Sequence, residues 1–97
     1  MTKTLYAEFT VKPGSEDRVA AMMRELTEHV RREPGNQLFL PYTREHNPRE
    51  YFVFEVYEDD AAFREHISAD YGARFNGELA EQIEEDGSVL TWLRPLS

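Results

Sequence analysis

The sequence predicts an α+β fold of the ferredoxin-like type, in which a four-stranded antiparallel sheet carries two helices on one face. Segments with the two-residue alternation of strands and segments with helical spacing follow one another in the order β-α-β-β-α-β. Two Pro-Gly pairs, Pro13-Gly14 and Pro34-Gly35, stand between segments where the chain has to turn. No repeat or linker divides the chain, which predicts one domain over residues 1–97.

The first half of the chain predicts a strand followed by a helix. Apolar and polar side chains alternate over residues 5–11, as in a strand with one buried face. From Glu16 to about Arg32 the apolar residues recur at helical spacing. Acidic residues fill the first turn of this segment and basic residues its last, an arrangement that the helix dipole favours.

A hairpin is predicted next, with strands over residues 37–46 and 51–57. Asn47-Pro48 supplies turn residues between them. Pro41 lies inside the first of these strands. Because proline has no N–H to donate to a neighbouring strand, we expect this strand at the edge of the sheet or interrupted by a bulge.

The last part of the chain predicts a second helical region and a fourth strand. Asp59 or Asp60 can cap the helical region, which is expected to continue to about Glu84 with a break at residues 68–70. The fourth strand is predicted over residues 88–94.

The third predicted strand is apolar on both faces. In an antiparallel sheet with one face exposed to water, that face would normally carry polar side chains. Two helices can cover only one face of the sheet. We therefore expect a second copy of the chain to cover the other face, in an obligate homodimer. One face carries Phe52, Phe54 and Val56, and the other carries Tyr51, Val53, Glu55 and Tyr57.

The amino-acid composition argues against two classes of binding partner. The net charge is −8, and the basic residues are scattered, so neither nucleic acid nor an anionic membrane surface is an expected partner. The absence of cysteine removes disulfides and fits a reducing compartment. No stretch approaches the length of an apolar membrane span, and the N-terminus alternates like a strand rather than a signal peptide. We expect a cytoplasmic protein.

Several motifs follow one another along the chain: Pro13-Gly14, Pro34-Gly35, Tyr42, Asn47-Pro48, Glu55-Val56-Tyr57, Asp59-Asp60 and His66. Their order resembles that of the antibiotic biosynthesis monooxygenase family, including its quinol-monooxygenase-like members. Proteins of this family are dimeric α+β barrels. The similarity extends over nearly the whole chain, whereas each motif alone is weak.

The resemblance implies a pocket between the sheet and the helices of each subunit, lined at Val53 and Tyr57. It also implies oxidation of a phenolic or quinol-type small molecule by O₂ without a cofactor. Relatives that oxygenate polyketides have Asn and Trp at these two positions. Haem-degrading relatives need an Asn where this chain has Phe9 and a His near Asn76, so haem degradation is not expected.

Glu55 and His66 are the predicted catalytic residues. Glu55 shares a strand face with Val53 and Tyr57, and His66 follows on the helix face expected to pack over the sheet. A histidine is suited to remove a proton near neutral pH, with Glu55 orienting it. The predicted substrate contacts are Tyr57, Val53, Phe9, Tyr42, Phe63 and Trp92.

Other interpretations of these residues remain open. Glu55 can be a buried structural acid paired with an arginine such as Arg74, and His66 can be a packed helix residue. The chain can equally be an isomerase of a small hydroxycarbonyl compound, or a non-catalytic dimer that binds a small ligand. No metal site is expected, because Glu25 with His29 and His66 with Asp70 lack a third ligand.

Overall fold

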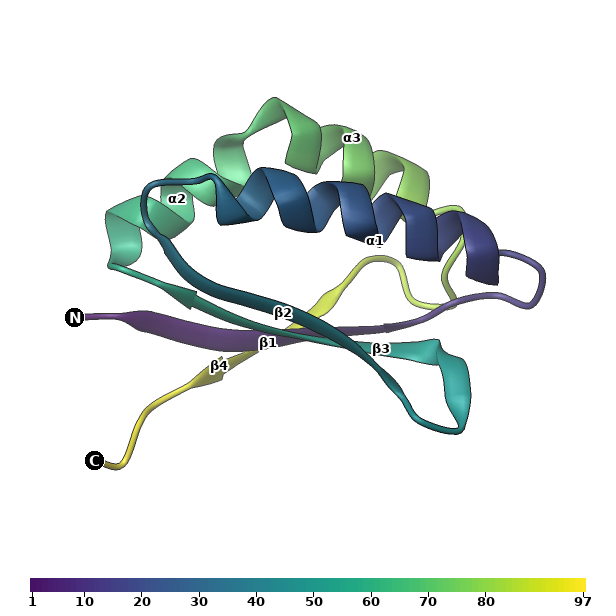
Figure 1. Cartoon of the computed structure of the whole chain (residues 1–97), viewed down its shortest axis with the longest axis horizontal. Helices are drawn as coiled ribbons and strands as arrows, with labels where there is room; N and C mark the ends of the chain where they lie inside the picture. The colour runs from purple at the N-terminus through teal and green to yellow at the C-terminus, as the bar shows by residue number, and fades with distance from the viewer.

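In the computed structural model, which describes residues 1–97, four strands form one antiparallel sheet and three helices lie on one of its faces (Figure 1). The strand order is β2-β3-β1-β4, so β1 and β3 are central and β2 and β4 are edges. This confirms the ferredoxin-like prediction. The elements are β1 (Lys3–Thr10), α1 (Glu16–Arg31), β2 (Asn36–Arg44), β3 (Asn47–Tyr57), α2 (Asp60–Ser68), α3 (Asp70–Leu79) and β4 (Val89–Leu93).

The proline of β2 lies in an edge strand, as predicted. β2 pairs only with β3, so the missing N–H of Pro41 interrupts no second ladder. Irregular pairing occurs at the two ends of the strand, between Asn36 and Leu38 and between Thr43 and Arg44, rather than at the proline.

The hairpin turn between β2 and β3 lies earlier than predicted. Arg44 pairs with Asn47 in the ladder, which leaves a two-residue turn at Glu45-His46 and places Asn47-Pro48 at the start of β3. The Asn47 side chain stabilises this start, because its oxygen accepts a hydrogen bond from the Arg49 N–H at 3.1 Å.

The second helical region divides into α2 and α3 at Ala69, whose ψ of 137° is extended, so the predicted break is confirmed. The Asp59 carboxylate caps α2 by accepting the Ala62 N–H at 2.8 Å. The prediction that the helix continues to Glu84 is wrong, because residues 82–84 pair with the end of β1 instead. The Lys12 N–H donates to the Gln82 oxygen at 2.8 Å, and the Glu84 N–H donates to Thr10 at 2.9 Å.

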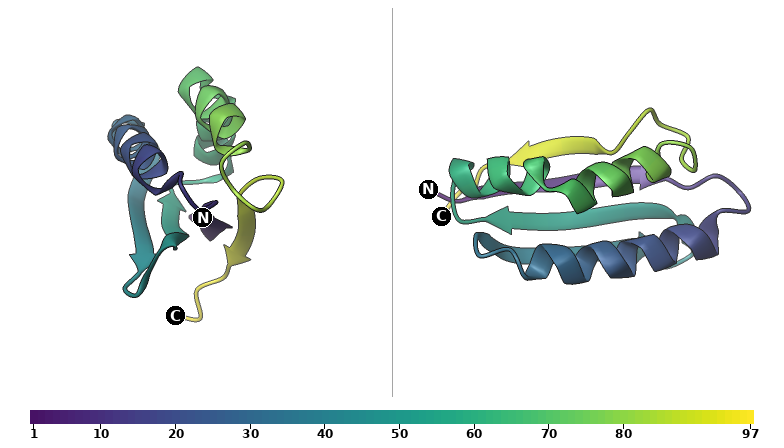
Figure 2. Two further views of the ribbon diagram at one scale, coloured as in Figure 1. Left: turned by 90° about the vertical axis from the view of Figure 1, so that its right-hand side faces the viewer. Right: turned by 90° about the horizontal axis from the view of Figure 1, so that it is seen from above.

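The two faces of the sheet differ in what covers them (Figure 2). The helices pack on the inner face and bury a core that includes Phe9, Val53 and Met23. No helix covers the outer face. None of the three helices has the length and hydropathy of a membrane span. By strand register the outer face carries Thr4, Tyr6, Glu8, Thr10, Leu38, Leu40, Tyr42, Glu50, Phe52, Phe54, Val56, Val89, Thr91 and Leu93.

Candidate active site

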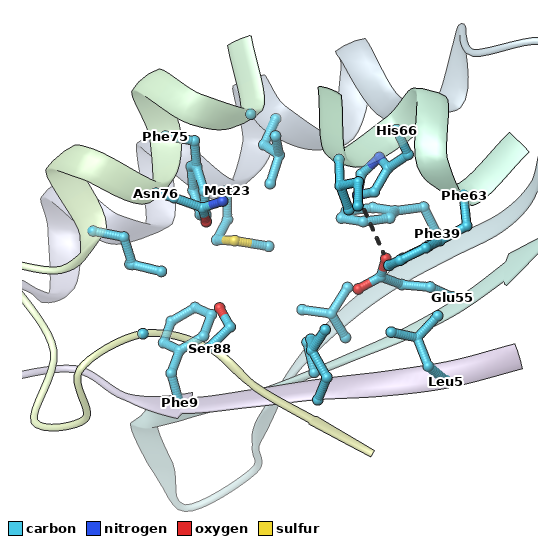
Figure 3. Close-up of a pocket in the computed structure, with 18 of the residues that line it drawn as sticks. Leu5, Phe9, Met23, Phe39, Glu55, Phe63, His66, Phe75, Asn76 and Ser88 are labelled. Carbon is cyan, nitrogen blue, oxygen red and sulfur yellow. Dashed lines mark ion pairs between the residues drawn. The ribbon is translucent and has the colours of Figure 1, made fainter. Parts of the chain in front are cut away.

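A cavity of about 320 Å³ lies between the inner face of the sheet and the helices (Figure 3). Twelve of its 19 lining residues are hydrophobic. Glu55 and His66 line one end, while Asn76 and Ser88 line the other, beside the loop that leads into β4. Asn76 is exposed, so this second end lies near the surface of the protein. The cavity is therefore a mainly apolar space with the ionisable residues Glu55 and His66 at its inner end.

Glu55 is the buried carboxyl group of this inner end. It projects from the C-terminal part of β3, two residues before the strand ends at Tyr57, and only 6% of the residue is exposed. Its Oε1 accepts a hydrogen bond from the Tyr57 hydroxyl at 2.7 Å and lies 3.8 Å from Nε2 of His66. Burial raises the pKa of Glu55, and the Tyr57 hydrogen bond and the charge of a protonated His66 oppose that rise. Glu55 is thus suited to hold a proton at higher pH than a surface glutamate.

We expect Glu55→Gln to stabilise the fold at pH 8 and to have a much smaller effect at pH 4.5. Because the pKa of Glu55 is raised above its reference value of 4.5 in the folded state, ionisation of this group costs stability as pH rises through the folded pKa. Glutamine removes that cost and can still accept from Tyr57. The variant should therefore unfold at a higher temperature than the parent at pH 8, while the two should melt at similar temperatures at pH 4.5.

Thermal melts of the parent and Glu55→Gln at the two pH values measure this difference. A variant that is less stable than the parent at pH 8 would show that the ionised carboxylate supports the fold.

His66 reaches the same end of the cavity from α2. Its Nδ1 lies 3.1 Å from both carboxylate oxygens of Glu33, and its Nε2 faces Glu55. The ring packs among aromatic side chains, with centroid separations of 4.8 Å to Tyr57 and 5.9 Å to Phe63. The sequence analysis did not predict Glu33. The only feature of the sequence that points to Glu33 is its position directly before the second Pro-Gly pair, Pro34-Gly35.

Gly35 allows the Glu33 turn to approach α2 closely. A Cβ at this position would overlap the Cβ of Ala62 and lie 3.3 Å from its Cα, so no larger residue fits without movement of the helix. The Glu58 N–H also donates to the Gly35 oxygen at 2.8 Å, which ties the turn to the end of β3. The second Pro-Gly pair therefore brings Glu33 beside His66.

We expect Gly35→Ala to lower the free energy of unfolding by about 1–3 kcal/mol, because the added methyl group overpacks the contact with α2. Gly77→Ala is a matched control. A Cβ at Gly77, in α3, meets nothing within 4 Å, so this change should be neutral or stabilising by up to about 1 kcal/mol. Urea denaturation measures both. Equal stability of the two variants would mean that the turn does not need this close approach.

The predicted catalytic residues lie together, and three of the predicted substrate contacts join them. Phe9, Val53 and Phe63 line the cavity with Glu55 and His66.

Tyr57, Tyr42 and Trp92 do not line the cavity. Tyr57 is fully buried beneath Glu55, and burial together with the Glu55 charge raises its pKa. Tyr42 pairs with Phe52 on the outer face and is 58% exposed. Trp92 shares the inner face with Leu5 but packs behind Phe63, edge-on at 4.9 Å.

Arg74, considered above as a partner of Glu55, lies elsewhere, and so does Arg44. Arg74 lines a separate groove between α1 and α3 and makes no ion pair with Glu55. Arg44 pairs with Glu50 at 3.0 Å on the surface. The cavity lining contains no Lys or Arg. Glu33 and Glu55 face different nitrogens of His66, and no group of three or more ligands is arranged to hold a metal ion.

Residues 3–77 match the family model for antibiotic biosynthesis monooxygenase. The chain belongs to this family. No curated protein is significantly similar to it in sequence. The family membership assigns the chain to a group of proteins described as monooxygenases.

Solved structures share the fold over the whole chain. Protein Rv0793 from Mycobacterium tuberculosis superposes with a TM-score of 0.91 at 21% identity, over 100% of this chain and 97% of that one. A structure described as an antibiotic biosynthesis monooxygenase gives 0.91 at 22% identity, over 100% of both chains. Protein PA3566 from Pseudomonas aeruginosa gives 0.90 at 23% identity, over 99% and 95%. At these identities the similarity establishes the fold of the antibiotic biosynthesis monooxygenases.

Proposed function

We propose that the chain is a cofactor-independent monooxygenase that oxidises a phenolic or quinol-type small molecule with O₂. The observation that carries this proposal is the position of His66, held between two carboxyl groups at the inner end of an apolar cavity. A positioned histidine can remove the proton of a substrate hydroxyl near neutral pH. The aromatic side chains of Phe9 and Phe63 supply apolar surface for a flat ring.

The chemistry needs no external reductant. His66 removes the hydroxyl proton of a quinol, and the resulting anion passes one electron to O₂. The two radicals combine at a ring carbon, and the proton returns to give a hydroperoxide. Loss of the C–H proton and cleavage of the O–O bond then release water and leave a carbonyl at that carbon. One oxygen atom enters the product, the other becomes water, and the substrate supplies all four electrons.

The charge of the cavity favours a neutral substrate. Its ionisable lining residues are Glu55, Asp86 and His66, and it contains no cationic side chain that could hold a phosphate or carboxylate group. Neutral phenols and quinols fit this lining better than a phosphorylated hydroxycarbonyl compound does. This favours oxygenation over isomerisation of a phosphorylated compound.

Oxygen uptake with 1,4-naphthohydroquinone and with anthrone tests the proposal. The rate above the non-enzymatic background should be unchanged by a metal chelator, and labelled O₂ should place one labelled oxygen atom in the product. Absence of uptake on the panel would contradict a monooxygenase of this substrate class. Binding of 1,4-naphthoquinone without any uptake of oxygen would instead support a non-catalytic ligand-binding protein.

We also propose that the protein is a homodimer joined through the outer face of the sheet. Apolar side chains dominate this face, and its large members are partly exposed in the single chain, including Leu38 at 44% and Leu93 at 39%. By register the face carries two charged residues of the central strands, Glu8 and Glu50, and Glu50 is paired with Arg44. A soluble monomer rarely exposes an apolar surface of this kind. Light scattering at micromolar concentration should give twice the mass of one chain, and the mass of a single chain would contradict the proposal.

A further inference from the structure

We propose that Glu33 is a positioning residue for His66, and that its carboxylate fixes the ring with the proton on Nδ1 and the lone pair of Nε2 toward the substrate. This inference rests on the proposed function, because it names the group that prepares the base. It concerns a residue outside the cavity lining, in the turn between α1 and β2.

The contact between Glu33 and His66 has the geometry of an orienting pair. Both oxygens of the carboxylate lie 3.1 Å from Nδ1. Each side chain is only 17% exposed, so water competes weakly for these groups. A carboxylate accepts hydrogen bonds and cannot donate one, which requires Nδ1 to carry a proton.

The other nitrogen is consequently the one that can act on a substrate. Nε2 lies 3.8 Å from Oε1 of Glu55, which is too long for a direct hydrogen bond. That oxygen already accepts from the Tyr57 hydroxyl. The lone pair of Nε2 is thus free to accept a proton from a hydroxyl group at this end of the cavity. When Nε2 takes the proton, the negative charge of Glu33 stabilises the imidazolium that forms.

The fold holds the backbone of Glu33 in place. The Glu33 N–H donates to the Val30 oxygen at 2.9 Å, and the Glu33 oxygen accepts from the Asn36 N–H at 3.1 Å. Gly35 in the same turn packs against α2, which carries His66. The turn and the helix are therefore in direct contact, and backbone hydrogen bonds on both sides of Glu33 support the position of its carboxylate beside Nδ1.

A second Glu–His pair, on the surface of α1, serves for comparison with the contact between Glu33 and His66. Glu25 and His29 lie on one face of α1 with 4.0 Å between the nearest oxygen and nitrogen, and their side chains are 78% and 38% exposed. This pair is longer, more exposed and outside the cavity lining. Glu25→Gln is accordingly a matched control, because it removes the same kind of pair without touching the site.

The test uses Glu33→Gln, Glu33→Ala and the control Glu25→Gln. Nitrogen-15 NMR of the His66 ring reports which nitrogen carries the proton of the neutral imidazole, with no need of substrate or turnover. The parent should show the proton on Nδ1. Glu33→Gln should retain it, because the amide oxygen still accepts. Glu33→Ala should shift the ring toward the form with the proton on Nε2, and Glu25→Gln should match the parent.

Kinetics with 1,4-naphthohydroquinone supply the second measurement. In Glu33→Ala we expect kcat to fall about 10–100-fold with KM little changed, since Glu33 touches the base and not the substrate. The kcat of Glu33→Gln should fall less, because the His66 ring keeps its orientation although the negative charge beside it is lost. Glu25→Gln should keep the parent kcat.

Two results would overturn the inference. One is a parent ring with its proton on Nε2, and the other is a His66 spectrum that Glu33→Ala leaves unchanged. If no compound of the panel is turned over but the ring responds to Glu33 as expected, the proposed function fails and the positioning role stands. If turnover is found and the ring does not respond, the reverse holds.

Discussion

Replacing His66 with Gln should lower kcat/KM for oxygen uptake with 1,4-naphthohydroquinone by about 10²–10⁴-fold, the usual contribution of a positioned general base. Glutamine is close to histidine in size and can still form hydrogen bonds, but it cannot take up a proton at neutral pH. The substrate hydroxyl would then have to lose its proton to water. The effect should appear in kcat, because the apolar lining that binds the ring is unchanged.

His29→Gln is the control for this variant. His29 lies on α1, stacks on Tyr71 at 4.7 Å and does not line the cavity, so its replacement should leave kcat/KM at the parent value. Melting temperatures of both variants show whether the fold is retained. A folded His66→Gln enzyme within a few-fold of the parent rate would remove His66 from the mechanism.

The sequence was sufficient to predict the order of the elements and the faces of the central strands. The two-residue period placed Val53 and Glu55 on the inner face and Phe52 on the outer face, and the strand register has this arrangement. The end of the second helical region was not predictable in the same way. Residues 82–84 leave the helical pattern to pair with Thr10 and Lys12, and such a long-range ladder leaves no mark in local periodicity.

The site was predicted only in part for a similar reason. Glu55 and His66 could be found because an ionisable residue on an apolar face is conspicuous within its own element. Glu33 could not be found in this way, because nothing near it in the chain indicates that it contacts His66, 33 residues away in α2. Tyr57 was predicted on the correct face, but its depth depends on Phe63 and His66 packing over it. The face of the sheet on which a side chain lies can be predicted from the sequence period. Its degree of burial depends on which other elements pack over that face.

Phe52→Asp should convert the proposed dimer into a folded monomer. Phe52 lies near the centre of the outer face, opposite Glu8 on β1 and Tyr42 on β2. In a single chain this side chain is only half-buried, so the subunit itself should tolerate a carboxylate there. In a dimer the same carboxylate would be buried at the contact in both subunits. The nearest cation, the Arg44 guanidinium 4.8 Å from the Phe52 ring, already pairs with Glu50. Each copy should cost about 3 kcal/mol or more.

Phe52→Leu provides the comparison, because it removes part of the aromatic surface but keeps the face apolar. Light scattering over a range of concentrations should find Phe52→Leu as a dimer and Phe52→Asp as a single chain, and circular dichroism should find both folded. A stable Phe52→Asp dimer with an unchanged melting temperature would place the subunit contact on another surface. The outer face would then need a different covering, because its apolar residues would still meet water in that assembly.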